Sequence, residues 1–144
     1  MSSILPLGRT VNVGYSATTS AVRANLRDAS GVLFILTGAT TGSVTINEYN
    51  AATGGTTQVA GNGASYVYFT QNNGVWTRQA ATTVNGTGGV AATTGGVLAI
   101  YVSAGSLSDG FSYVSASHAT GNFTYIIGDL NVGRKPENLR DFRA

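Results

Sequence analysis

The chain has 144 residues, enough for one domain that buries roughly 68–70% of its unfolded surface without metals or cross-links. It contains no cysteine, which excludes a disulfide framework and a thiolate metal site. Charged residues make up 10% of the chain and the formal net charge is +2. This balance excludes disorder through self-repulsion, and it favours neither nucleic acid nor a membrane as a partner.

The charges are unevenly distributed. Residues 134–144 hold four of the eight basic and two of the six acidic residues, so the rest of the chain has no net charge. A body with so little charge is typical of a subunit whose surface meets other chains. The first eight residues lack the basic leader of a signal peptide, and no stretch approaches the ~20 apolar residues of a membrane-spanning helix. We therefore expect synthesis in a cytoplasm.

Apolar and polar residues alternate over residues 10–15, which predicts a half-buried strand. Residues 20–27 alternate again and favour a strand, with a helix as the alternative because Ala, Leu and Arg are good helix formers. Residues 31–37 are apolar on both faces, as in a strand covered on both sides, whereas residues 43–49 alternate. The short glycine-bounded link at residues 38–42 predicts that these two strands form a hairpin.

The strongest local signal is Asn73-Gly74, which lies between the β-type runs 65–70 and 75–79. Asn-Gly tolerates positive φ at both central positions and suits a type I′ turn. This register sets Phe69 opposite Arg78 and Gln71 opposite Trp76. One face would then carry Val67, Phe69, Trp76 and Ala80, and the other Tyr66, Tyr68, Thr70 and Thr77.

The other segments complete an all-β pattern. Residues 50–62 are predicted to be a connection around a short segment at 57–59, and residues 82–96 to be a polar, glycine-dense loop. Three strand-like runs follow, at residues 97–102, 111–117 and 122–127. About eight to ten short strands separated by turns predict an antiparallel β-sandwich, with a β-barrel as the alternative.

The chain offers few groups for catalysis. His118 is the only histidine, and pairing it with Asp109 and a serine lacks the local signature of a catalytic triad. Asp28 and Glu48 are conceivable glycosidase carboxylates, but turn caps and ion pairs with arginine are the favoured interpretation. Residues 61–65 begin like a phosphate-binding loop without its third glycine or a following helix. We therefore predict no enzyme, and no catalytic, cofactor or metal site.

The aromatic residues of the hairpin, Tyr66, Tyr68, Phe69 and Trp76, suggest a stacking platform. Single-stranded nucleic acid would also need interleaved basic residues, and only Arg78 is present. Core packing and cross-strand pairing are the favoured role. A carbohydrate-binding module that uses Tyr66, Tyr68 and Trp76 remains an alternative.

Residues 131–144 are predicted to be an extended C-terminal arm that follows a β-sandwich domain at residues 10–130. Residues 1–9 are a second candidate arm. Proline restricts the residue before it to extended conformations, two apolar residues provide anchors, and arginines suit bidentate contacts with carboxylates. Such a peptide is suited to lie along a neighbouring subunit or to extend its sheet. The predicted interaction residues are Arg134, Lys135, Pro136, Glu137, Asn138, Leu139, Arg140, Phe142 and Arg143.

The C-terminal third resembles small head proteins of tailed bacteriophages, the minor capsid or decoration proteins. The likeness lies in residues 108–114, 123–127 and 129–139, and it covers roughly the last 40 residues. It implies a compact β domain with a terminal arm that sits on the capsid surface of the virion, commonly as a trimer. The implied partners are the major capsid protein and further copies of the chain, and the family has no catalytic residues.

The expected function is therefore that of a virion structural protein, synthesised in the host cytoplasm, that binds and stabilises the assembled head shell as a homo-oligomer. A tail or head–tail connector protein is the first alternative. The carbohydrate-binding surface module is the second.

Overall fold

The computed structural model of the chain describes residues 10–17, 22–38, 42–59, 65–66, 68–79, 82–83, 90–92 and 96–130. Both predicted arms, residues 1–9 and 131–144, lie outside these ranges. No helix within them is long and apolar enough to cross a membrane. The strands are β1 (Thr10–Ala17), β2 (Ala24–Asn25), β3 (Ala29–Thr37), β4 (Gly42–Tyr49), β5 (Thr57–Val59), β6 (Ser65–Tyr66), β7 (Tyr68–Asn72), β8 (Val75–Arg78), β9 (Thr82–Thr83), β10 (Val90–Ala92), β11 (Val97–Ser103), β12 (Tyr113–Ser117) and β13 (Asn122–Leu130).

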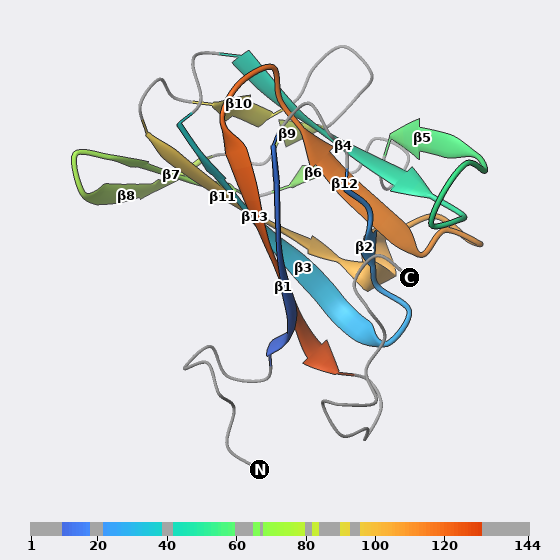
Figure 1. Cartoon of the computed structure of the whole chain (residues 1–144). Helices are drawn as coiled ribbons and strands as arrows, with labels where there is room; N and C mark the ends of the chain where they lie inside the picture. The colour runs from blue at the N-terminus through green and yellow to red at the C-terminus, as the bar shows by residue number, and fades with distance from the viewer. Residues whose placement is uncertain are drawn as a thin grey trace.

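The strands form two antiparallel layers, which confirms the predicted β-sandwich (Figure 1). The six-stranded sheet has the order β1-β13-β3-β11-β7-β8. The facing five-stranded sheet has the order β10-β4-β12-β2, with β5 paired to β4. Strands β6 and β9 form a separate pair. Because each of the two main sheets is open at both edges, the barrel alternative does not apply.

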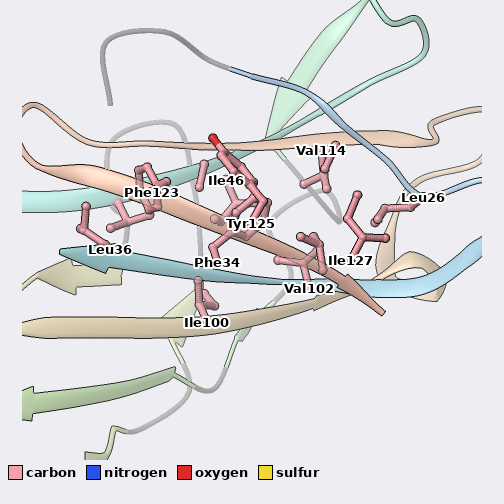
Figure 2. Close-up of a cluster of buried hydrophobic side chains, with 14 of the residues drawn as sticks. Leu26, Phe34, Leu36, Ile46, Ile100, Val102, Val114, Phe123, Tyr125 and Ile127 are labelled. Atoms are coloured by element: carbon pink, nitrogen blue, oxygen red, sulfur yellow. The ribbon is translucent and has the colours of Figure 1, made fainter. Parts of the chain in front are cut away.

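The core lies between the two layers and is lined by alternate residues of each strand. Strands β3, β11 and β13 contribute Val32, Phe34, Leu36, Leu98, Ile100, Val102, Phe123, Tyr125 and Ile127, all almost fully buried. The facing sheet contributes Val44, Ile46, Val114 and Ala116, and Leu26 closes one end. Figure 2 shows these side chains meeting between the strands. The two-residue period of a strand places each set on one face.

Three aromatic rings occupy the middle of this core. Phe34 and Tyr125 are register partners on neighbouring strands, and their rings meet edge to face with centroids 4.9 Å apart. Phe123 packs edge to face against Phe34 at 6.3 Å. Edge-to-face pairs gain about 0.5–1.5 kcal/mol beyond the burial of their surface, so this cluster fixes the central register of the six-stranded sheet.

The predicted hairpin of residues 31–37 and 43–49 is wrong. Strand β3 belongs to the six-stranded sheet and β4 to the five-stranded sheet, so the chain crosses between the layers here. Packed sheets lie about 10 Å apart, and a five-residue link can span about 16 Å. A short link with glycines at its ends is therefore compatible with a crossing as well as with a hairpin.

Three further expectations need correction. Of residues 20–27 the structure describes 22–27, and within that part the only strand is the two-residue β2, which is the predicted type but shorter. Residues 82–96, predicted to be a loop, include strands β9 and β10, and β10 pairs with the edge of β4. Strand β3 is fully covered on one face only, because Leu33 and Ile35 remain partly exposed. The outer face of its sheet is therefore apolar but not buried.

Candidate interaction surface

The β7–β8 hairpin has the predicted geometry. Asn73 and Gly74 occupy the turn with φ values of 49° and 80°, and Phe69 pairs with Arg78 and Gln71 with Trp76. All four residues of β8 are exposed. In Figure 1 the hairpin extends to the left, beyond the other strands. The Asn-Gly turn thus carries an exposed edge strand away from the core.

Contacts at the base of the hairpin hold it to the body. Tyr68 packs against the hydrophobic core, and Thr70 is buried with 8% of its surface exposed. The Gln79 side chain donates a hydrogen bond from Nε2 to Thr70 Oγ1 at 2.7 Å, and the Gln79 main-chain N–H donates to the Tyr68 carbonyl at 2.8 Å. The inward side of the hairpin is therefore fixed, which orients its other side outward.

The outward side continues across β7, β11, β3 and β13 of the six-stranded sheet. Strand alternation and the registers of β13, β3, β11, β7 and β8 place these residues on the face away from the core. We call this set the outer aromatic face. Its members are Leu33, Ile35, Phe69, Trp76, Arg78, Ala99, Tyr101 and Ile126, and Gln71, Val97 and Thr124 share the same face.

Three aromatic side chains of this face remain open to solvent. Phe69 is 42% exposed, Tyr101 48% and Trp76 50%. Leu33, Ile35, Ala99 and Ile126 are partly exposed between them, and Arg78 is the one charged member of the set. Contiguous exposed apolar surface on a soluble domain marks a site of interaction, and aromatic residues dominate the energetic centres of protein interfaces.

Tyr101 is held close to the sheet by Gly31. A Cβ atom added to Gly31 would collide with the Tyr101 ring and would lie 2.5 Å from the Val102 carbonyl oxygen. Gly31 is itself buried. The ring therefore lies over the glycine and presents its other side outward.

On the five-stranded sheet, arginine side chains lie over the outward aromatic rings. The Arg23 guanidinium lies 3.8 Å above the Tyr49 ring and donates hydrogen bonds to the carbonyls of Ala51 and Gly54. The Arg27 guanidinium lies 5.3 Å from the centre of the Tyr113 ring. These two tyrosines are only 6% and 4% exposed. The Arg27 Nε donates a hydrogen bond to Ser112 Oγ at 3.2 Å, so both arginines bind oxygen atoms as well as aromatic rings.

The Glu48 carboxylate serves to hold the fold together. It is fully buried, accepts a hydrogen bond from Gln58 Nε2, and accepts another from the Ser108 main-chain N–H at 3.0 Å. It therefore ties β5 and the loop before β12 to β4. The predicted partner Asp28 lies in the turn before β3.

His118 is also inside the protein, with 6% of its surface exposed. Its Nδ1 lies 2.8 Å from the Thr120 carbonyl and 3.1 Å from the Thr120 N–H, whereas Nε2 is buried without a hydrogen-bond partner. Asp109 occupies an exposed turn closed by the Phe111 N–H and the Ser108 carbonyl. Among the described residues, no three potential metal ligands gather.

The residues predicted to form a carbohydrate platform do not all share one face. Tyr68 points toward the core and Trp76 away from it, while the side chain of Tyr66 lies outside the described part of the chain. The arm residues Arg134 to Arg143 also lie outside it. Tyr101 was missed as a surface residue, because residues 97–102 are apolar on both faces and carry no polar alternation.

Comparison of the chain with models of known protein families, with curated proteins and with solved structures yields no match. The resemblance to phage head proteins therefore rests on the C-terminal residues alone.

Proposed function

We propose that the protein is a virion structural protein, a decoration or minor capsid protein that binds the assembled head shell as a homo-oligomer. The observation that carries this proposal is the outer aromatic face, where three aromatic rings are about half exposed. An interface needs such anchors. The C-terminal resemblance supplies the virion as the setting.

The electrostatics support the same proposal. Outside residues 134–144 the basic and acidic residues balance, and the net charge of each copy is only +2, so long-range repulsion between many closely packed copies is weak. The carboxylate of Glu48 and the imidazole of His118 lie inside the fold, where they are better placed to hold strands and turns than to meet a substrate. A subunit that binds the assembled shell and not the free shell protein stabilises the shell by mass action.

The proposal is tested by measuring how much of the protein purified virions carry. Replacing Phe69 and Trp76 together by Ala is expected to lower this occupancy at least about tenfold, because each anchor contributes on the order of 1–2 kcal/mol. The matched control is Val75→Ala, which removes an apolar side chain 65% exposed on the other side of the same hairpin. Unchanged occupancy of the double variant, or absence of the wild-type protein from virions, would refute the proposal.

Deletion of residues 134–144 tests the role of the arm. We expect a folded domain, verified by an unchanged β-type circular dichroism spectrum, that no longer joins the particle. Full occupancy by the truncated chain would show that the arm is dispensable. The number of copies per virion distinguishes a decoration protein from the connector alternative, since a decoration protein covers the whole shell and a connector occupies one vertex.

The carbohydrate-binding alternative draws on one specific observation, the outward rings of Phe69 and Trp76 on neighbouring strands. Trp76 is the only tryptophan, so its fluorescence reports on this surface alone. A saturable change on addition of oligosaccharides would favour this alternative, and a constant spectrum would remove it.

A further inference from the structure

Strand β8 is the last strand of the six-stranded sheet, and within the described part of the chain it has a neighbouring strand on one side only. All four of its residues are exposed, and Figure 1 shows its hairpin projecting beyond the other strands. An edge strand presents unpaired main-chain donors and acceptors to other chains. β8 contains no proline, and its register with β7 is continuous, so it lacks two of the features that block an edge.

The register of the hairpin determines which main-chain groups point toward this edge. The Gln79 N–H donates to the Tyr68 carbonyl, so these two residues form a hydrogen-bonded pair. Such pairs recur at every second residue of an antiparallel ladder, which turns the main-chain groups of Thr77 toward β7 as well. The N–H and C=O groups of Trp76 and Arg78 therefore point away from β7, toward the open side.

The side chains of the same two residues have complementary chemistry. Trp76 and Arg78 lie two residues apart on the outer aromatic face, and the tryptophan is 50% exposed. Arginine stacks favourably on aromatic rings, and the chain places an arginine over a tyrosine ring twice on its other sheet. A second β8 that runs antiparallel to the first would set a ring beside each arginine and an arginine beside each ring.

Of the registers related by a two-fold axis, one joins these unlike groups. When Trp76 faces Arg78 of the second copy, and the reverse, both residues exchange main-chain hydrogen bonds across the edge. Setting Trp76 opposite itself leaves Arg78 facing the turn at Gly74, and setting Arg78 opposite itself places like charges together, which is destabilising. In the mixed register Arg78 lies between Phe69, its neighbour on β7, and the Trp76 ring of the other copy.

We propose that β8 of one copy pairs antiparallel with β8 of a second copy about a two-fold axis at Thr77, with Trp76 of each copy beside Arg78 of the other. This pairing joins the two six-stranded sheets into one continuous sheet and removes the open edge from both. The contact closes as a dimer, because the same strand serves both copies. The inference rests on the proposed function, since it names one contact of the homo-oligomer.

The absence of cysteine allows a single substitution to test the pairing. Thr77 would face Thr77 of the second copy in a non-hydrogen-bonded pair with Cα atoms about 4.5 Å apart, a separation that a disulfide can bridge. The full-length Thr77→Cys variant is oxidised mildly in dilute solution, and the disulfide-linked dimer is measured by non-reducing electrophoresis. The matched control is Val75→Cys, an exposed position on the same side of β8, whose two copies would lie about 14 Å apart.

We expect at least about tenfold more linked dimer with Thr77→Cys than with Val75→Cys, because only the first pair is within bonding distance. Adding Trp76→Ala to the Thr77→Cys chain should lower the yield about fivefold, because both ring–arginine contacts are lost. Equal yields from the two cysteine variants, or a yield that Trp76→Ala does not change, would overturn the proposal.

The same variant separates this inference from the proposed function. Virions that carry the Thr77→Cys chain but form no disulfide on oxidation would refute the pairing and leave the proposed function standing. A disulfide that forms in the purified protein, combined with absence of the protein from virions, would refute the proposed function and leave the pairing standing.

Discussion

The two sheets of this sandwich present aromatic residues to the outside in opposite ways. Tyr49 and Tyr113 on the five-stranded sheet are covered by Arg23 and Arg27 and are almost fully buried. Phe69, Trp76 and Tyr101 on the six-stranded sheet are about half exposed. The first group stabilises the folded chain, whereas the side chains of the second group leave about half of their surface open to solvent. The same residue types thus serve stability on one face and, on our account, association on the other.

Truncating one ring on each face should separate these roles most strongly. Tyr49→Ala removes a buried ring, its contact with Arg23 and its hydrogen bond to Ser115. We expect a loss of about 3–5 kcal/mol in the free energy of unfolding, as for other buried aromatic side chains. Trp76→Ala should cost about 1 kcal/mol or less, because half of that side chain is already in water. Urea denaturation of both variants measures the difference, and equal losses would contradict it.

The contact between Gly31 and Tyr101 connects the exposed face to the stability of the sheet. Gly31→Ala would force its new Cβ against the Tyr101 ring and the Val102 carbonyl. Overpacking of this kind costs about 1–3 kcal/mol. The control is Gly105→Ala, whose Cβ would meet only Ser103 Oγ at 3.6 Å and should change stability by less than about 0.5 kcal/mol. Matching losses for the two variants would show that the Tyr101 ring is not held there.

Replacing one arginine on each face by glutamine compares what the two arginines contribute to stability. Arg23→Gln removes the cation above Tyr49 and its hydrogen bonds to the Ala51 and Gly54 carbonyls, at an expected cost of about 1–2 kcal/mol. Arg78→Gln changes an exposed residue of β8, and the expected cost is below about 0.5 kcal/mol. Thermal unfolding of both variants in dilute solution measures the two losses of stability. A loss for Arg78→Gln as large as that for Arg23→Gln would contradict the view that Arg23 stabilises the fold and Arg78 does not.

The smallest effect concerns one buried hydrogen bond. The Tyr49 hydroxyl lies 3.0 Å from Ser115 Oγ inside the protein. Tyr49→Phe should cost about 1 kcal/mol, since it leaves the serine hydroxyl without this partner. In the Tyr49→Phe, Ser115→Ala double variant, part of the loss should be recovered. Strict additivity of the two single changes would show that the bond contributes nothing.

Local features of the fold could be predicted from the sequence, because their causes are local. Asn73-Gly74 specified the β7–β8 hairpin and its register through the backbone freedom of those two residues. Alternation located β1, and apolar runs located β11 and β13. The pairing of β13 with β1 and β3 joins segments far apart in the chain. No local turn sequence specifies such a pairing. The wrong prediction of a hairpin between β3 and β4 has the same cause.

Only part of the candidate surface could be predicted from the sequence, for a related reason. Residues 97–102 are apolar on both faces, so the pattern does not say that Ile100 faces the core and Tyr101 the solvent. Which of these two side chains is buried depends on which face of the strand the second sheet packs against. Similarly, alternation places Glu48 on the face of Val44 and Ile46, but its partners Gln58 and Ser108 are supplied by other segments.

The most direct test of the account is the solvent accessibility of Trp76, the only tryptophan of the chain. In dilute solution the ring should be quenched readily by iodide, because half of its surface is exposed. As the protein assembles or joins its particle, the account predicts a severalfold fall in the quenching constant and a shift of the emission to shorter wavelength. A quenching constant and an emission maximum that stay the same in the dilute and the assembled protein would contradict the claim that this face is an interface.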